Sequence, residues 1–131
     1  FEGIIACAKA ALENDIPVVL GNDVGCPWIT QYDFWRELCY FRKYVGVSNA
    51  FALHTATGRA TEVMGLGSVT GTIEVGKCAD LIVTREDPLA DLRALRSVDM
   101  VVARGRRYDA PRVKHNALVT AELDKFLPGN D

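Results

Sequence analysis

A short stretch near the N-terminus holds the residues best suited to chemistry. In VVLGNDVGCPW, residues 18–28, an apolar run leads into Asn22 and Asp23, and Cys26 and Trp28 follow. A carboxylate placed there can accept a proton from an attacking water or bind a divalent metal ion. Without a cation, a buried carboxylate is costly. Taken alone, the stretch is more typical of an Asx turn or a helix N-cap, where Asp and Asn are favoured.

Three residues beside this aspartate, Asn22, Cys26 and Trp28, are candidates for a substrate pocket. Cys26 can serve as a soft metal ligand, although a small hydrophobic packing role is more common for a free cysteine. Trp28 can line a pocket, although aromatic residues in loops more often serve packing. His54 falls among alanines of a predicted helix, which favours a surface histidine over a metal ligand.

The elements around this stretch follow the pattern of an α/β protein. Residues 3–14 place apolar side chains at helical spacing, and the apolar run at 17–20 is typical of a short buried strand. A helix that leads into a fully apolar strand is common where a parallel sheet is covered on both faces. Functional groups in such sheets gather just beyond the carboxyl ends of the strands. Asp23 occupies that position.

Two helices are expected downstream of the loop. Residues 32–44 predict an aromatic-rich helix that Gly46 ends. Ser48 is suited to be the N-cap of the next helix, which Gly58 ends. Thr57 is suited to cap one further turn.

After the helices the pattern changes to short β-like segments. Residues 80–85 and 99–105 contain β-branched runs and flank a short helical stretch at 89–95. We expect Gly71 and Gly76 in turns that need positive φ, a conformation that glycine tolerates.

This pattern divides the chain into three segments. We expect residues 1–66 to form an α/β piece and residues 67–109 to form a small β-rich piece. The tail at 110–131 contains one possible amphipathic helix, at 117–127, and no evident site chemistry.

Composition excludes several classes of protein. The 131 residues are 49% hydrophobic and 24% charged, values of ordinary globular proteins, and the apolar runs are too short to span a bilayer. With 15 Lys plus Arg against 17 Asp plus Glu, no strong field recruits nucleic acid or anionic lipid. The 4 cysteines form no C-x-x-C pair, which argues against a disulfide framework. We expect a soluble, cytoplasmic protein.

Three ordered blocks carry a family resemblance. They are VVLGNDVG at 18–25, VGVSNAFALHTATGRATEVMGL at 45–66 and GTIEVGKCADLIVTREDPLADLRALRSVDMVVARGRRY at 71–108. Together they resemble the C-terminal part of metal-dependent amidohydrolases of the imidazolonepropionase and prolidase-like type. The resemblance covers roughly residues 3–109.

The resemblance implies a C-terminal fragment of a (β/α)8 TIM-type barrel with part of a small composite β-sandwich. Residues 17–21 would be the eighth barrel strand, 1–66 the barrel piece and 67–109 the sandwich segment. Asp23 would contact the metal centre and accept a proton from the metal-bound water as it attacks a carbonyl or amidine carbon. Asn22 departs from the threonine that is more common beside this aspartate in the family.

The implied activity is hydrolysis of a C–N bond in a small-molecule substrate, either a cyclic amide or amidine or a dipeptide-like amide. Zinc is the expected metal, with iron or manganese as alternatives. The H-x-H pair and later histidine ligands of the family are absent here, so the missing N-terminal portion would have to supply them. The fragment alone would then be inactive.

Two further expectations follow. A barrel and a sandwich cut in this way expose apolar faces and unpaired strand edges, which predicts association with the missing portion or a homo-oligomer. The alternative function is a non-catalytic structural or binding module that keeps the amidohydrolase architecture.

Overall fold

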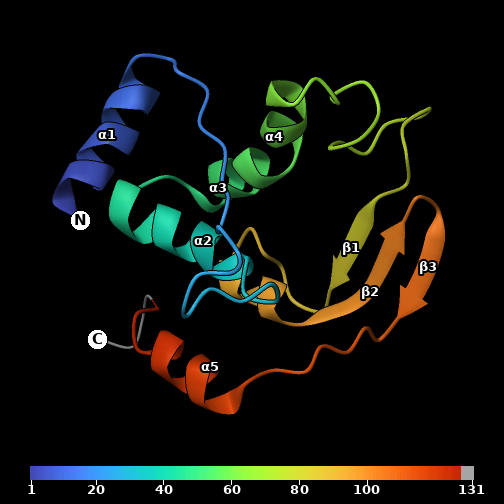
Figure 1. Ribbon diagram of the computed structural model, residues 1–131. Helices are drawn as coiled ribbons and strands as arrows, with labels where there is room; N and C mark the ends of the chain where they lie inside the picture. The colour runs from blue at the N-terminus through green and yellow to red at the C-terminus, as the bar shows by residue number, and fades with distance from the viewer. Residues whose placement is uncertain (128–131) are drawn as a thin grey trace.

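Helices fill the first half of the chain, and one small antiparallel sheet follows in the second half (Figure 1). The computed structural model describes residues 1–127. The chain is therefore α/β in content, as predicted. The division into segments at residues 66 and 109 stays a prediction. Within residues 1–127, no helix is long and apolar enough to cross a membrane.

The first helix, α1 (Glu2–Glu13), confirms the predicted helix at 3–14. The strand predicted at 17–20 is not formed among residues 1–127, because residues 16–20 pair with none of the described strands. A strand is stabilised by hydrogen bonds to a neighbour, and no described segment supplies one. The eighth barrel strand, and with it the barrel piece, stays a prediction.

The aromatic-rich helix begins later than its sequence pattern predicts. Helix α2 (Trp35–Tyr40) continues directly into a π-helical turn, η1 (Phe41–Val45). A turn in which the amide of Asp33 donates to the carbonyl of Thr30 at 3.2 Å delays the helix beyond residue 32. Gly46, with φ of 88°, ends η1 as predicted.

Two short helices follow in close succession. Helix α3 (Asn49–Ala56) is capped by Ser48, whose hydroxyl accepts a hydrogen bond from the Phe51 amide at 3.1 Å, as predicted. Gly58 does not end this helix but begins α4 (Gly58–Val63). The hydroxyl of Thr57 donates to the Leu53 carbonyl at 2.7 Å, so it does not cap the new helix.

The segment between α4 and the sheet runs without a strand, and glycine shapes it. Gly71 and Gly76 have φ of 99° and 93°, as predicted. Gly71 also lies against α4, because a Cβ there would be 2.1 Å from the Oγ1 atom of Thr61. The close contact leaves no space for a larger residue.

The sheet has the strand order β1-β2-β3 and is antiparallel throughout. Its strands are β1 (Leu81–Thr84), β2 (Val98–Ala103) and β3 (Arg106–Asp109), with a 3-10 turn, η2 (Leu92–Arg96), between the first two. Strands β1 and β2 confirm the β-like segments predicted at 80–85 and 99–105, whereas β3 was not among them, and η2 overlaps the predicted helical stretch at 89–95.

A tight hairpin joins β2 to β3. Arg104 and Gly105 both have positive φ, 49° and 78°, which matches the twist that two-residue hairpin loops favour. The Asp80 carboxylate accepts the Arg104 amide at 2.7 Å and the Thr70 hydroxyl at 2.9 Å. The Arg104 contact, followed by the Thr70 contact, lowers the pKa of Asp80. Asp80 therefore has a structural role at this turn.

The last helix, α5 (Ala117–Asp124), confirms the helix predicted in the tail. The Asn116 side chain caps it, accepting hydrogen bonds from the amides of Leu118 and Val119. In Figure 1, α5 lies below α2, so the end of the chain returns to its first half.

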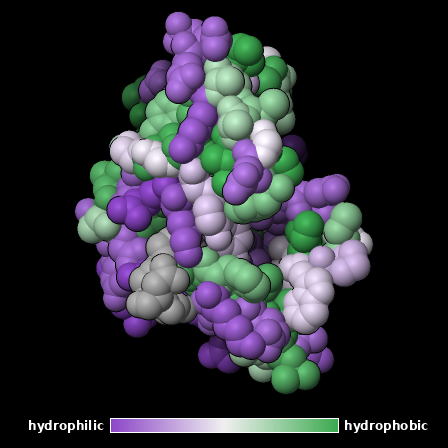
Figure 2. Space-filling model, turned by 90° about the vertical axis from the view of Figure 1, so that its left-hand side faces the viewer, coloured by the Kyte–Doolittle hydropathy of each residue, from purple (hydrophilic) through white to green (hydrophobic). Residues whose placement is uncertain are grey.

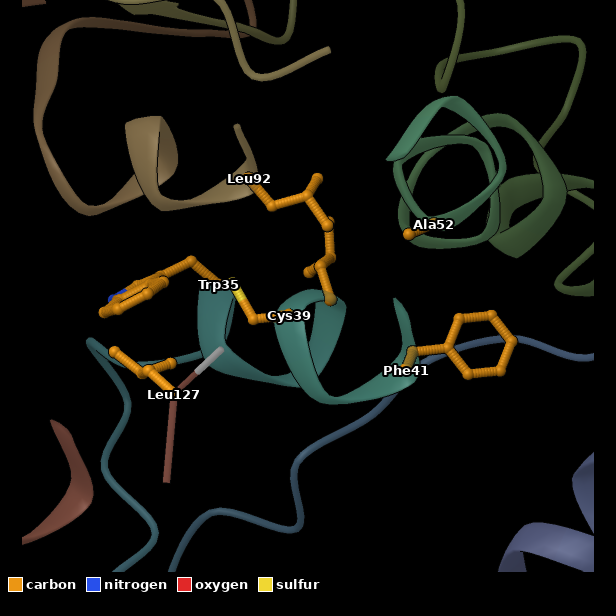
Figure 3. Packing of buried hydrophobic residues seen from close by; sticks show 7 residues of the cluster. Trp35, Cys39, Phe41, Ala52, Leu92 and Leu127 are labelled. Carbon is orange, nitrogen blue, oxygen red and sulfur yellow. The ribbon is translucent and has the colours of Figure 1, made fainter. Parts of the chain in front are cut away.

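The core gathers around α2 (Figure 3). Leu127, just beyond α5, lies beside Trp35, and Leu92 of η2 reaches the same cluster. The buried hydrophobic members are Trp35, Leu38, Cys39, Phe41, Ala52, Leu92 and Leu127. Segments far apart in the sequence, from α2 to the residues just beyond α5, thus share one core.

Many large apolar side chains remain at the surface. Ile73 is 87% exposed, Phe1 is 78% exposed and Ile4 is 73% exposed. Figure 2 shows hydrophobic side chains reaching the surface at several places among polar ones, on the face that carries α1. Exposed apolar side chains in this number are available for packing against further protein surface.

Candidate functional site

Asp23 lies on a tight bend between the extended segment at 16–20 and α2. Its φ is 46°, a left-handed conformation that Asp tolerates better than most residues. Val24 and Cys26 form an isolated bridge across the bend, and the Asp23 side chain is exposed. The carboxylate therefore faces solvent.

The side chain of Cys26 contacts Asp23 within the bend. Its thiol donates to Oδ2 of Asp23 with a sulfur–oxygen distance of 3.6 Å. The structure thus brings two of the predicted site residues together. Within residues 1–127, however, no group of three or more His, Cys, Asp or Glu side chains is arranged to hold a metal ion. These two donors alone do not make a metal site.

Asn22 and Trp28 share a pocket of about 160 Å³ at the start of α2. The Asn22 side-chain amide donates to the Thr30 carbonyl at 3.5 Å, a long contact. Trp28 is 58% exposed and has φ of 69°. As far as residues 1–127 define this pocket, Asp23 and Cys26 are not in its lining. The predicted site residues thus form two pairs: Asp23 contacts Cys26, and Asn22 lines a pocket with Trp28.

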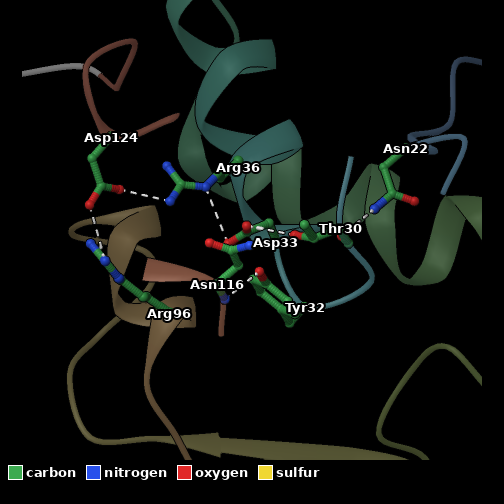
Figure 4. A network of polar contacts seen from close by, with 8 residues as sticks. All are labelled: Asn22, Thr30, Tyr32, Asp33, Arg36, Arg96, Asn116 and Asp124. Atoms are coloured by element: carbon green, nitrogen blue, oxygen red, sulfur yellow. Dashed lines mark hydrogen bonds and ion pairs between the residues drawn. The ribbon is translucent and has the colours of Figure 1, made fainter. Parts of the chain in front are cut away.

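A charged network that the sequence did not predict includes three residues of the pocket lining, Thr30, Asp33 and Arg36 (Figure 4). Arg36 is only 2% exposed, and its Nε atom lies 3.2 Å from Oδ1 of buried Asp33. Its Nη2 atom donates to Oδ1 of Asp124 at 2.7 Å, and Arg96 donates to the other Asp124 oxygen at 3.1 Å. Thr30 completes the network by donating its hydroxyl to Oδ2 of Asp33 at 2.6 Å.

The network shifts the pKa values of its members. Burial opposes the charged form of Arg36, but the hydrogen bond to Asp124 and the charge of Asp33 outweigh it and raise the pKa of the guanidinium. Burial would also raise the pKa of Asp124, but its contacts with Arg36 and Arg96 hold that pKa below its ordinary value. Burial raises the pKa of Glu37, which lines the same pocket.

Part of this network could have been predicted from the sequence. Asp33 and Arg36 are three residues apart, the spacing at which opposite charges meet on a helix. Asp124 is 88 residues from Arg36, and no local pattern connects them. The tail at 110–131 was predicted to hold no site chemistry, and that prediction missed the contact of Asp124 with Arg36.

The remaining polar candidates lie elsewhere. His54 is exposed on α3, and its ring approaches the Gly58 backbone closely enough that a Cβ there would be 3.2 Å away. His115 packs against Tyr32 with ring centroids 4.3 Å apart. His54 is thus at the surface, as predicted, whereas His115 contacts a residue far away in the sequence.

Comparison with known proteins places the chain in a family. The amidohydrolase family profile matches residues 2–108. The "putative prolidase from Bifidobacterium longum" is similar over 92% of this chain and 30% of its own, with 40% identity and a TM-score of 0.89. A search among curated proteins finds no match.

Two further structures share the fold. A Xaa-Pro dipeptidase with bound methionine in its active site is 28% identical over 81% of this chain and 25% of its own, with a TM-score of 0.73. A molinate hydrolase is 26% identical over 86% and 27%, with a TM-score of 0.62. The chain thus spans between 25% and 30% of the length of these three proteins. It belongs to the amidohydrolase family.

Proposed function

We propose that the protein containing this chain hydrolyses the C–N bond of a dipeptide-like amide. The similarity to the Bifidobacterium longum protein, 40% identity over 92% of the chain, carries this proposal. The relation to a Xaa-Pro dipeptidase favours a dipeptide-like substrate over a cyclic amide or amidine.

In this proposal Asp23 accepts the proton released by the attacking water and passes it to the leaving amine. General acid–base catalysis by a positioned carboxylate contributes about 10²–10⁴-fold to rates. Two observations support the role: the carboxylate faces solvent on a bend, and the bend adjoins the pocket that Asn22 and Trp28 line. In that pocket Asn22 and Trp28 would contact the substrate.

The proposal includes a divalent metal ion, with zinc preferred. Asp23 would be one ligand, and the Cys26 sulfur, 3.6 Å from Oδ2 of Asp23, would lie beside the ion. The other ligands would come from the rest of the protein, because this chain offers no complete set among residues 1–127. A bound ion of this kind lowers the pKa of a coordinated water to about 7.

Asp23→Asn in the whole protein tests the assignment. Asn removes the carboxylate charge but tolerates the left-handed backbone, so the bend should survive. We expect kcat for Xaa-Pro dipeptides to fall by about 10²-fold or more. The measurement is steady-state hydrolysis, together with the metal content of the purified protein.

Asp15→Asn is the matched control. Asp15 is also an exposed aspartate with positive φ, 55°, and it lies in the turn after α1. This variant should keep wild-type kcat. Equal activity of the two variants would remove Asp23 from the mechanism, and a wild-type protein that binds but never hydrolyses dipeptides would support the non-catalytic alternative.

We also propose that the exposed apolar side chains of this chain pack against the rest of the protein or a second copy. Sedimentation of the 131-residue chain alone should then show self-association. A monomer that stays stable on dilution would contradict this expectation.

A further inference from the structure

The C-terminal helix contacts the segment that leads from the candidate site. Helix α5 lies beyond residues 2–108, the part that the family profile matches. Its last residue, Asp124, nevertheless bonds to the buried guanidinium of Arg36 on α2. A contact across 88 residues ties the end of the chain to the start of α2.

From Arg36 the contacts continue toward the site. Arg36 lies 3.2 Å from Asp33, and Asp33 accepts the Thr30 hydroxyl at 2.6 Å. The carbonyl of Thr30 in turn accepts the side-chain amide of Asn22, the residue before Asp23. Figure 4 shows this succession of side chains from Asp124 to Asn22.

A second contact joins the same two segments. The hydroxyl of Tyr32 accepts the backbone amide of Asn116, the N-cap of α5, at 3.0 Å. The ring of Tyr32 also packs edge-on against His115. Both ends of α5 are therefore fastened to residues 30–36.

Burial makes the charged contacts effective restraints. Asp33 and Arg36 are 7% and 2% exposed, so water competes little for their hydrogen bonds. Without Asp124, Arg36 would keep a buried charge with one partner fewer. The segment would relieve that cost by moving toward solvent.

We propose that Asp124 is a positioning residue for the segment 22–33, which carries Asp23 and lines the substrate pocket. Asp124 acts through Arg36, Asp33 and Thr30 and does not touch the substrate. The expected effect of Asp124 on catalysis rests on the proposed function. Its expected effect on the stability of the segment 22–33 does not.

The test compares three variants of the whole protein. Asp124→Asn removes the charge that holds Arg36, and Thr30→Val breaks the contact to Asp33 without altering α5. Glu122→Gln is the control, because Glu122 also lies on α5 and the substitution removes an exposed ion pair with Lys125, the C-cap residue. Amide hydrogen exchange over residues 22–33 and steady-state kinetics on Xaa-Pro dipeptides are the readouts.

We expect exchange at the Ile29 and Asp33 amides to accelerate about tenfold in both test variants, the change that a loss of roughly 1.4 kcal/mol of local stability produces. Both amides are hydrogen-bonded in the segment. The kcat should fall with a smaller change in KM, and Asp124→Glu should restore it in part. Glu122→Gln should match wild type.

Two outcomes separate the proposals. Unchanged exchange over residues 22–33 in Asp124→Asn, or an unchanged kcat in an active enzyme, would overturn the positioning role alone. If wild-type protein hydrolyses no dipeptide, the proposed function fails. Accelerated exchange in that protein would still support the restraint by Asp124.

Discussion

Replacement of Gly71 by alanine tests how the segment after α4 is held. The added Cβ would lie 2.1 Å from Oγ1 and 2.7 Å from Cγ2 of Thr61. Thr61 is buried on α4, and its hydroxyl donates to the Gly58 carbonyl at 2.8 Å. The threonine cannot rotate away without losing that bond, so the backbone at residue 71 must shift.

The expected cost has two parts. A side chain in the left-handed region costs roughly 1–2 kcal/mol per residue. Forcing extra volume into a packed contact adds about 1–3 kcal/mol. Gly71→Ala should therefore lower the free energy of unfolding by about 2–5 kcal/mol.

Gly76→Ala separates the backbone cost from the packing cost. Gly76 has nearly the same φ, 93°, but no atom lies within 4 Å of the position of its Cβ. This control should lose only the backbone cost, about 1–2 kcal/mol. The assay is urea unfolding followed by circular dichroism, with similar m-values required for comparison. Equal losses for the two variants would refute the packing of Gly71 against Thr61.

Two more predictions concern thiols and pH. Cys39 should react with a thiol reagent only on unfolding, because it is buried and its pKa is raised to about 11; rapid labelling of the folded chain would contradict this. Three exposed thiols should react quickly: Cys7, Cys26 and Cys78. Because the pKa of Asp124 is lowered by folding, its contribution to stability is present above the unfolded value, about 3.9, and is lost as pH falls through the folded value. Asp124→Asn should therefore lose stability near neutral pH and show a smaller further loss on acidification, measured by urea unfolding at several pH values.

Local features of the fold followed from the sequence. The Ser48 cap, the Gly46 stop and the positive φ of Gly71 were predicted from residue type and near neighbours. Each depends on backbone preferences or hydrogen bonds within a few residues, which the sequence displays directly. Strands β1 and β2 were predicted for the same reason, because both contain β-branched runs beside turn residues, whereas β3 has no such run.

The candidate site could be predicted from the sequence only in part. Asn22, Cys26 and Trp28 were predicted for a substrate pocket. Asn22 and Trp28 line a cavity that, as far as residues 1–127 define it, does not include Cys26, and contact of any of them with a substrate stays a prediction. The roles of Asp23 and Cys26 in catalysis and metal binding stay predictions, because no group of three or more His, Cys, Asp or Glu side chains among residues 1–127 is arranged to hold a metal ion.

The sequence by itself determined that helices occupy the first half of the chain, where glycine turns fall and which family the chain resembles, because spacing, caps and ordered motifs are properties of neighbouring residues. Only the tertiary structure decided that residues 16–20 pair with no strand in the described part of the chain and that Asp124 holds Arg36. A strand needs a partner, and a buried guanidinium needs carboxylates brought to it from distant parts of the chain. Such contacts depend on which surfaces meet in the fold, and no local pattern records them.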